Sequence, residues 1–127
     1  MFLFTEAILN NKPIKVFNNG NLSRDFTFID DIIDGVTATL LGNTDEPYML
    51  YNIGNSTPVK LLDFIEEIEN TTQIKADKQF LPMQQGDVEK TWADVTDLKR
   101  DFGYSPKVNV KEGVQKFVDW YKSYYNI

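Results

Sequence analysis

The sequence predicts a small mixed α/β (α+β) domain in which helices and short strands alternate. Its 127 residues are enough for one domain with a hydrophobic core, and 42% of them are apolar. Segments with helical apolar spacing alternate with short β-branched and aromatic runs, and turn residues separate them. No internal repeat, low-complexity region or linker interrupts this order, so residues 1–127 are expected to form a single domain.

The first third of the chain predicts two helices with extended segments between them. Residues 1–11 have helical apolar spacing, and residues 14–17 form a β-branched and aromatic run typical of a strand. The Asn-Asn-Gly-Asn run at 18–21 predicts a turn, and residues 23–29 alternate as an extended segment does. Residues 31–41 then predict a helix that the following glycine ends.

The middle of the chain predicts a strand followed by an amphipathic helix. Residues 47–53 are aromatic and β-branched, which favours a strand. Thr57 suits the N-cap of the next helix and Pro58 its first position, and the Asn-Thr-Thr run at 70–72 ends it. The expected apolar stripe of this helix is Leu61, Leu62, Ile65 and Ile68.

The last third predicts a strand and two helices. Residues 78–83 favour a strand, and residues 94–102 favour a short helix capped by Asp94 and ended by Gly103. Residues 111–125 favour a long helix. Its expected buried face consists of Val114, Phe117, Val118 and Tyr121.

Composition excludes several classes of function. The net charge of −6, with scattered basic residues, argues against a nucleic-acid binder. The chain has no His and no Cys, which rules out His-dependent triads, disulfides and thiolate metal sites. The absence of Cys is compatible with the cytoplasm, where we expect the protein. No apolar run approaches the ~20 residues of a membrane span, and no basic region precedes the first helix, so we expect neither a membrane protein nor a secretory signal.

The chain also lacks the marks of a dinucleotide-dependent catalytic centre. No two of its seven glycines lie three residues apart, so there is no dinucleotide or phosphate-loop fingerprint. No Tyr is followed four residues later by Lys, so the Tyr/Lys acid–base pair of short-chain dehydrogenases has no place here. The first predicted helix begins abruptly at Met1, which indicates a piece of a longer protein, with a natural start at Met1 as the alternative.

Arg24 is the first candidate binding residue. It stands between an extended segment and a helix start, where a guanidinium can hold a phosphate bidentately beside helix-terminal amides. The alternative is a surface arginine paired with Asp25 or Asp30. Phe17 is a second candidate, because it ends a predicted strand, where an open α/β sheet usually holds its ligand.

Two acidic features have structural alternatives. Asp30, Asp31 and Asp34 superficially resemble an aspartate-rich motif for a magnesium-bound diphosphate, but acids in the first turn of a helix also favour the helix dipole, and we predict no metal site. Gly86 and Asp87 read as a loop turn when taken alone.

Taken in order, several short motifs resemble the C-terminal part of NAD-dependent nucleotide-sugar epimerases and dehydratases, the extended short-chain dehydrogenases. Among these the chain is most similar to UDP-glucuronate 4-epimerases, and the similarity covers essentially the whole chain. The markers are 15–17, 23–31, 51–54, 84–88, 92–94 and 102–106, followed by Glu112-Gly113 and 117–121.

The resemblance implies roles for five residues. It implies that Arg24 binds the diphosphate of the sugar nucleotide, that Phe17 stacks near the uracil and that Asp87 contacts the ribose. Many relatives have Arg where this chain has Gln84, whose amide can still donate a hydrogen bond to a phosphate. Val59 is implied to line the uridine pocket.

The resemblance further implies that the chain is the substrate-binding lobe of a larger enzyme. The family oxidises C4 of the sugar with NAD, and its Rossmann domain, Tyr/Lys pair and usual dimer helices would lie outside this chain. The isolated chain is then expected to be inactive, with no catalytic or cofactor-binding residue of its own. The alternatives are the lobe of a related dehydratase or decarboxylase, a stand-alone nucleotide-binding module, and an interaction domain that uses the aromatic residues 120–125.

Overall fold

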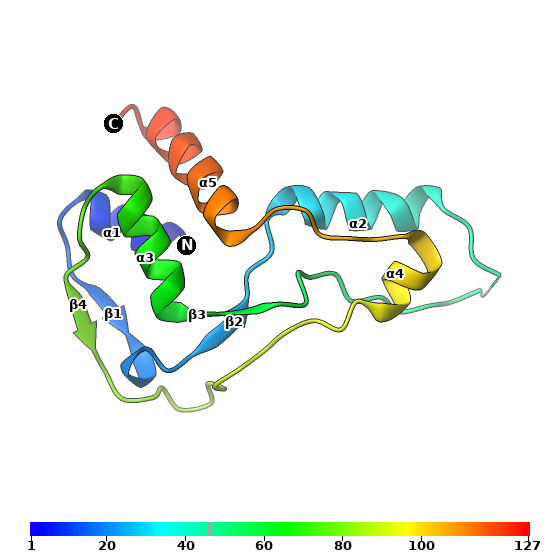
Figure 1. The fold of residues 1–127 in the computed structure, drawn as a ribbon, viewed down its shortest axis with the longest axis horizontal. Helices are drawn as coiled ribbons and strands as arrows, with labels where there is room; N and C mark the ends of the chain where they lie inside the picture. The colour runs from blue at the N-terminus through cyan, green and yellow to red at the C-terminus, as the bar shows by residue number, and fades with distance from the viewer. Residues whose placement is uncertain (46) are drawn as a thin grey trace.

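The computed structural model describes residues 1–45 and 47–127, and its helices gather in two groups (Figure 1). In chain order the elements are α1 (Phe2–Leu9), β1 (Ile14–Val16), the short turn η1 (Phe17–Gly20), β2 (Ser23–Asp25), α2 (Ile29–Leu41), β3 (Pro58–Lys60), α3 (Leu61–Thr72), β4 (Lys78–Phe80), α4 (Thr96–Phe102) and α5 (Val110–Tyr125). Figure 1 shows α1, α3, α5, β1 and β4 in one half of the molecule and α2 and α4 in the other. None of the described helices is long and apolar enough to cross a membrane.

The larger hydrophobic core lies in the half formed by α1, α3, α5 and β1. Apolar residues recur every three or four positions on α3 and α5, so each helix presents one apolar stripe to the others. The buried members are Ile8, Ile14, Val16, Phe64, Ile65, Ile68, Val114 and Val118. β1 pairs with β4 in parallel, Ile14 opposite Lys78 and Val16 opposite Phe80, so both strands end at the same edge.

A smaller core lies beside α4. Val95, Leu98 and Tyr104 are buried there against half-buried aromatic neighbours. The buried carboxylate of Asp31, on the first turn of α2, accepts the backbone N–H groups of Lys107 at 2.8 Å and Val108 at 3.1 Å. This carboxylate therefore ties the segment before α5 to the start of α2.

A two-stranded antiparallel sheet lies between the two halves. β2 pairs with β3, with Ser23 opposite Lys60, Arg24 opposite Val59 and Asp25 opposite Pro58. Because β3 runs directly into α3 and β2 is followed closely by α2, this short sheet fixes where each helix starts.

Most of the predicted elements are confirmed. The helices expected at 1–11, 31–41 and 111–125 correspond to α1, α2 and α5. The strand expected at 14–17 is β1, the one expected at 78–83 is β4, and the Asn-rich turn at 18–21 is η1 with one residue after it. The helix expected at 94–102 is α4, but it begins at Thr96. Asp94 stands before it, and its Oδ1 accepts the N–H of Thr96 at 3.0 Å.

The strand predicted at 47–53 is wrong for this chain. The segment is not a strand, although its side chains alternate in burial, with Tyr51 and Ile53 half-buried and Asn52 exposed. Its contacts are made by side chains: the Tyr51 hydroxyl donates to Asp101 at 2.9 Å, and Asn52 donates to the carbonyl of Asp94 at 3.2 Å. A strand needs a neighbouring strand for its backbone groups, and none of the described residues provides one here.

The predicted start of the next helix is also wrong. Pro58 does not open the helix, because residues 58–60 form β3 and pair with β2. The helix begins at Leu61, with Lys60 as its N-cap residue. Of the expected stripe, Ile65 and Ile68 are fully buried, whereas Leu62 is 36% exposed.

The apolar face of α2 points away from the molecule. Its buried positions are Asp31 and Gly35, and a Cβ on Gly35 would approach Ile53 to 2.9 Å, so the helix packs closely on this side. The opposite face carries an exposed apolar stripe, named the α2 stripe below. Its members are Ile29, Ile33, Val36 and Leu40, which are between 50% and 78% exposed.

Candidate functional site

The candidate site lies at the edge where β1 and β4 end. Phe17 follows β1 directly and is half-buried in η1. The end of β4 is held beside it, because the N–H of Leu81 donates to the carbonyl of Val16 at 2.9 Å and the N–H of Asn19 donates to that of Leu81 at 3.0 Å. The loop that leaves β4 therefore starts next to Phe17.

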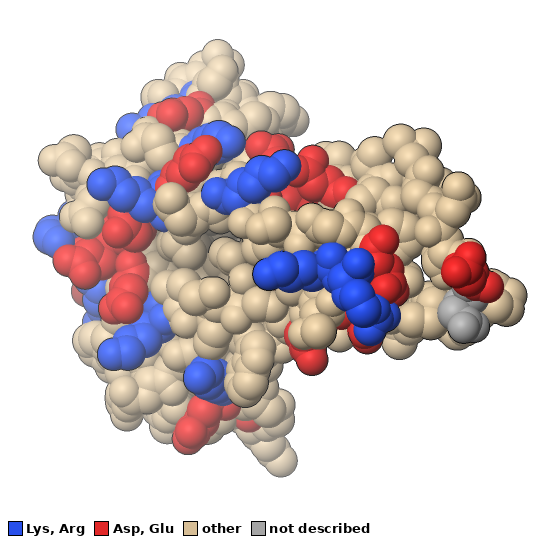
Figure 2. Space-filling model, turned by 45° about the vertical axis from the view of Figure 1, so that its right-hand side comes forward, with Lys and Arg blue, Asp and Glu red and all other residues tan. Residues whose placement is uncertain are grey.

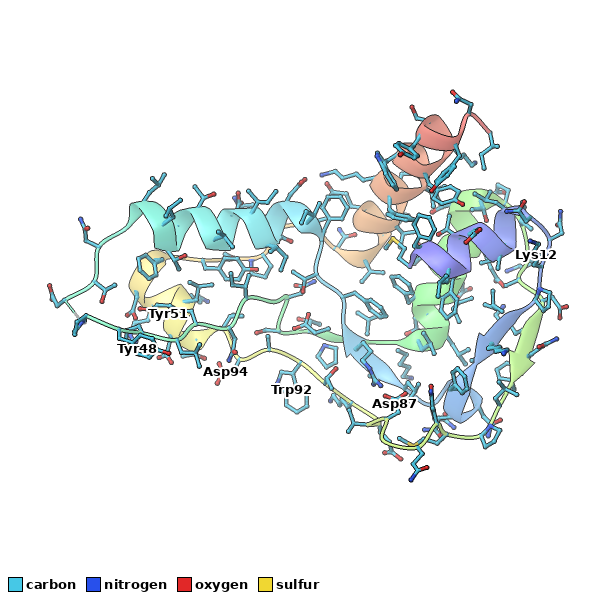
Figure 3. The ribbon with its side chains drawn as sticks, turned by 180° about the vertical axis from the view of Figure 1, so that it is seen from behind. Lys12, Tyr48, Tyr51, Asp87, Trp92 and Asp94 are labelled. Carbon is cyan, nitrogen blue, oxygen red and sulfur yellow. The ribbon has the colours of Figure 1, made fainter. Side chains whose placement is uncertain are left out.

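This loop brings Asp87 to Arg24, so the two residues can contribute to one site. Nη2 of Arg24 lies 2.5 Å from Oδ1 of Asp87, and the two side chains are 26% and 31% exposed. Nη1 of Arg24 donates to the carbonyls of Ser23 at 2.9 Å and Glu89 at 3.3 Å. Arg24 is thus oriented by Asp87 and by two carbonyls rather than by Asp25 or Asp30. Figure 3 shows Asp87 on the long loop close to β2.

Val59 is related to this ion pair through Arg24, and Gln84 is related to it through Asp87. Val59 lies opposite Arg24 in the β2–β3 pair and is half-buried. Gln84 is exposed, and its carbonyl accepts the N–H of Asp87 at 3.1 Å across a turn that includes Gly86 at φ +83°. The turn interpretation of Gly86 and Asp87 is therefore confirmed, and it does not compete with a binding role, because the turn presents the Asp87 carboxylate to Arg24.

The acidic residues at the start of α2 do not form a metal site. Asp31 accepts backbone N–H groups, Asp34 pairs with Lys107 at 2.8 Å, and Asp30 lies 3.5 Å from Lys116. Within residues 1–45 and 47–127, no three acidic side chains converge as metal ligands would. Asp30 and Asp31 lie in the first turn of α2, where acidic side chains favour the helix dipole.

Asp25 is a residue of this region that sequence reasoning missed. Its carboxylate accepts the backbone N–H groups of Asn55, Ser56 and Ala93, each at 3.0 Å. These donors lie 30 to 68 positions away in the sequence, so no local spacing could reveal them. Its position directly after Arg24 was the one available signal.

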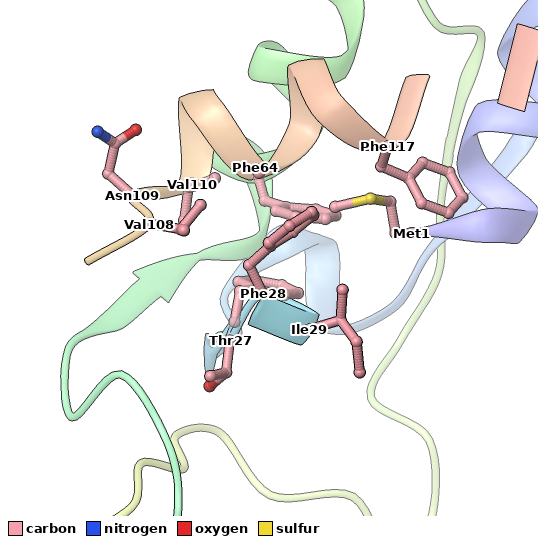
Figure 4. A pocket seen from close by; sticks show the side chains of 11 residues that line it. Met1, Thr27, Phe28, Ile29, Phe64, Val108, Asn109, Val110 and Phe117 are labelled. Carbon is pink, nitrogen blue, oxygen red and sulfur yellow. The ribbon is translucent and has the colours of Figure 1, made fainter. Parts of the chain in front are cut away.

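An apolar hollow of the described surface lies elsewhere. It has a volume of about 270 Å³ and opens between the start of α2 and the start of α5 (Figure 4). Met1, Phe28, Ile29, Phe64 and Phe117 line it, as Figure 4 shows, and no charged side chain does. An apolar hollow without a cation cannot hold a diphosphate, so it is not part of the Arg24 site.

The charges seen on the face in Figure 2 are mixed. Lys and Arg side chains alternate with Asp and Glu there, without a broad patch of one sign. Such a surface is unsuited to a polyanion, which needs clustered cations, but one guanidinium is enough to orient a single diphosphate.

The chain is similar to known proteins over nearly its whole length. The chain is 41% identical to the protein CapI of Staphylococcus aureus, over 98% of its own length and 42% of that protein's. It is 36% identical to a probable UDP-glucuronate 4-epimerase of Rhizobium meliloti, again over 98% of this chain and 42% of the relative. It also superposes on a UDP-glucuronic acid 4-epimerase of Bacillus cereus, solved with UDP-glucuronic acid and NAD, with a TM-score of 0.89 and 33% identity.

That superposition covers 96% of this chain but 39% of the Bacillus cereus protein, so the chain spans less than half the length of the relatives it matches. The model of the family described as GDP-mannose 4,6 dehydratase matches residues 2–117. The chain therefore belongs to this family of nucleotide-sugar enzymes, and it corresponds to part of proteins that include UDP-glucuronate 4-epimerases.

Proposed function

We propose that the chain is the UDP-sugar-binding lobe of an NAD-dependent nucleotide-sugar epimerase, acting at C4 of UDP-glucuronate. The observation that carries this proposal is the Arg24–Asp87 pair, which lies near the edge where β1 and β4 end. A guanidinium suits the diphosphate, and an adjacent carboxylate suits the hydroxyls of a ribose. The names of the Rhizobium meliloti and Bacillus cereus relatives support the choice of UDP-glucuronate.

Each predicted residue has a part in this proposal. Arg24 binds the diphosphate and Asp87 accepts hydrogen bonds from the ribose hydroxyls. Phe17 offers its ring to the uracil, and Val59 closes the apolar side of the uridine pocket. Gln84, exposed on the loop, donates its amide N–H to a phosphate oxygen once the loop folds over the ligand.

Binding must rearrange the ion pair. In the described structure Asp87 occupies one edge of the Arg24 guanidinium at 2.5 Å, where a phosphate oxygen would otherwise bind. A diphosphate brings more charge than one carboxylate, so it displaces Asp87 from that edge and leaves the carboxylate free for the ribose. The Asp87 side chain therefore turns from Arg24 toward the ribose when the ligand binds, while the backbone of residues 89–93 stays beside β2.

The NAD and the acid–base chemistry are assigned to a Rossmann part outside this chain. NAD supplies the hydride acceptor and donor at C4 of the sugar. The described residues do not fit NAD, because β1 leads into η1 and β2 instead of a glycine-rich turn and a helix N-terminus. We therefore expect the isolated chain to be inactive, and the whole enzyme to be a homodimer formed through its Rossmann part.

Exposed apolar surface on the α2 half favours the proposal of a second, Rossmann-type lobe. The α2 stripe leaves four apolar side chains exposed, and the apolar hollow continues it, because Ile29 belongs to both. The unpaired segment 47–53 lies in the same half of the molecule and keeps the alternating burial of a strand. An exposed apolar helix face and an unpaired strand-like segment are both surfaces that a further polypeptide can cover, and a Rossmann domain would supply such a polypeptide.

A titration of the chain with nucleotides tests the proposal. We expect weak binding of UDP and UDP-glucuronate by calorimetry or NMR, because the isolated lobe supplies only part of the pocket. Replacing Arg24 by Ala should weaken binding about tenfold or more, since it removes a charge-assisted bidentate contact. The matched control is Arg100→Ala, the other arginine of the chain, which lies on α4 and pairs with Asp97 and Asp101.

The competing candidate is a dehydratase lobe, which the description of the matching family favours. It predicts preferential binding of GDP and GDP-mannose rather than UDP and UDP-glucuronate. Equal UDP affinity in the Arg24→Ala and wild-type chains would remove Arg24 from the site. Tight UDP-sugar binding by the wild-type chain alone would instead favour a self-contained nucleotide-binding module.

A further inference from the structure

We infer that Asp25 is a positioning residue that holds the loop bearing Asp87 against β2 and so fixes the Arg24 guanidinium for its ligand. This inference rests on the proposed function for the identity of the ligand, but its structural part can be tested without any ligand. Asp25 is not itself placed against the substrate: it acts on Arg24 and Asp87 through the backbone of other segments.

The Asp25 carboxylate is a junction of three chain segments. Oδ1 accepts the N–H of Asn55 at 3.0 Å and the Thr27 hydroxyl at 3.3 Å. Oδ2 accepts the N–H groups of Ser56 and Ala93, both at 3.0 Å. The Asp side chain offers an acceptor oxygen on each side, whereas a carboxamide would turn an NH₂ group toward some of these donors.

The segment around residue 54 is shaped to fit this carboxylate. A Cβ added at Gly54 would lie 2.5 Å from Cβ of Ala93 and 2.8 Å from Oδ2 of Asp25, so only glycine permits the close approach. Ser56 takes the left-handed conformation with φ 58°, and its hydroxyl donates to the carbonyl of Ala93 at 2.6 Å. The left-handed Ser56 backbone and the close approach at Gly54 both occur where this segment contacts the Asp25 carboxylate.

The junction reaches the Arg24 site through the segment that runs beside β2. The N–H of Ser23 donates to the carbonyl of Glu89 at 2.8 Å, and the N–H of Thr91 donates to that of Ser23 at 3.3 Å. Asp25 holds the far end of this segment at Ala93, and Asp87 with its contact to Arg24 forms the near end. Without the bond from Ala93 to Asp25, the segment would lose the charged acceptor that holds its far end, and the remaining contacts would leave it more mobile.

The test replaces Asp25 by Asn in the 127-residue chain, with Asp30→Asn as the matched control for charge. Asp30 is an exposed residue five positions away, and its carboxylate lies 3.5 Å from Nζ of Lys116. We expect Asp25→Asn to speed amide exchange at residues 87–93 and to raise the Kd for UDP about tenfold, the equivalent of one charge-assisted hydrogen bond. Asp30→Asn should change neither.

Two further variants separate positioning from general destabilisation. Gly54→Ala leaves the carboxylate in place but wedges the junction apart, so it should weaken UDP binding as Asp25→Asn does. Val118→Ala destabilises the distant core and should leave the Kd unchanged below its melting temperature. Equal loss of affinity in Val118→Ala would show that Asp25 matters only for folding.

The ligand assignment and the positioning role fail in different ways. If the wild-type chain binds no UDP while Asp25→Asn still loosens residues 87–93, the positioning role stands and the UDP assignment falls. If exchange at residues 87–93 is unchanged in Asp25→Asn, the inference is overturned whatever the nucleotide affinity.

Discussion

Three carboxylates connect separate segments of the chain by accepting backbone N–H groups. Asp25 and Asp31 accept backbone N–H groups from segments at least 30 positions away. Glu69 on α3 accepts the N–H of Ala76 at 2.9 Å and side-chain donors from Lys75 and Lys78. Because a charged acceptor makes stronger hydrogen bonds than a neutral one, each carboxylate fixes a loop that has little apolar surface of its own.

Glu69 makes the stability of the chain depend on acid pH. Its side chain is 4% exposed, and this burial alone would raise its pKa, but hydrogen bonds from Lys78, Lys75 and the Ala76 N–H lower the pKa to about 2. The folded pKa is thus below that of the unfolded chain. The stabilisation is therefore complete above about pH 4.5 and is lost as the pH falls toward 2.

We expect Glu69→Gln to lower the free energy of unfolding at pH 7 by roughly 2–4 kcal/mol, since a buried charged acceptor is lost. Urea unfolding at a series of pH values measures both effects, and the variant should show a flatter slope between pH 4.5 and 2. Glu66→Gln, an exposed position on the same helix, is the control and should behave as the wild type. An unchanged slope in Glu69→Gln would assign the acid sensitivity to other carboxylates.

At the scale of elements, the start of α5 depends on one side chain. Oδ1 of Asn109, the N-cap residue, accepts the N–H of Glu112 at 2.9 Å. Asn109→Ala should therefore destabilise the chain by about 1 kcal/mol, whereas Asn109→Ser keeps a capping oxygen and should cost much less. Thermal unfolding of the two variants provides the measurement, and equal losses would mean that the cap bond contributes nothing.

The α2 stripe leads to a different kind of prediction, because at least half of each of its side chains is exposed. Ile33 is 54% exposed, so Ile33→Lys should change the free energy of unfolding by no more than about 0.5 kcal/mol. It should, however, reduce self-association in sedimentation velocity, since an exposed apolar face favours contact between copies. Thr37→Lys, at an exposed polar position of α2, controls for charge. A large loss of stability in Ile33→Lys would show that the stripe is packed after all.

The elements that the sequence predicts correctly are those whose signals are local. The apolar spacing of residues 111–125 and the glycine at 103 act within a few residues, and α5 and the end of α4 follow them. The predictions for segment 47–53 and for the residues around Pro58 are wrong because strand formation depends on a pairing partner. Residues 58–60 form a strand because β2 pairs with them, whereas 47–53 has no strand partner in the described chain. Asp87 was linked to Arg24 by resemblance alone, whereas the role of Asp25 depends on three tertiary contacts.

For the whole molecule, the two cores differ in size and in what holds them. The core around α3 and α5 contains eight buried apolar residues, and the core beside α4 contains three. The half with α2 and α4 also has the exposed α2 stripe and the unpaired segment 47–53. Burial of apolar area is the main stabilising contribution, so the two halves should differ in local stability.

Native-state amide exchange measures this difference. We expect the amides of Phe64 and Val118, in the larger core, to exchange about tenfold or more slowly than that of Leu98 in α4, because α4 opens without disrupting the larger core. In the whole enzyme, the proposed second lobe would cover the α2 stripe and pair with 47–53, so protection of α2 and α4 should rise there. Equal protection of both halves in the isolated chain would show a single cooperative unit, in which the α2 half needs no further partner to be stable.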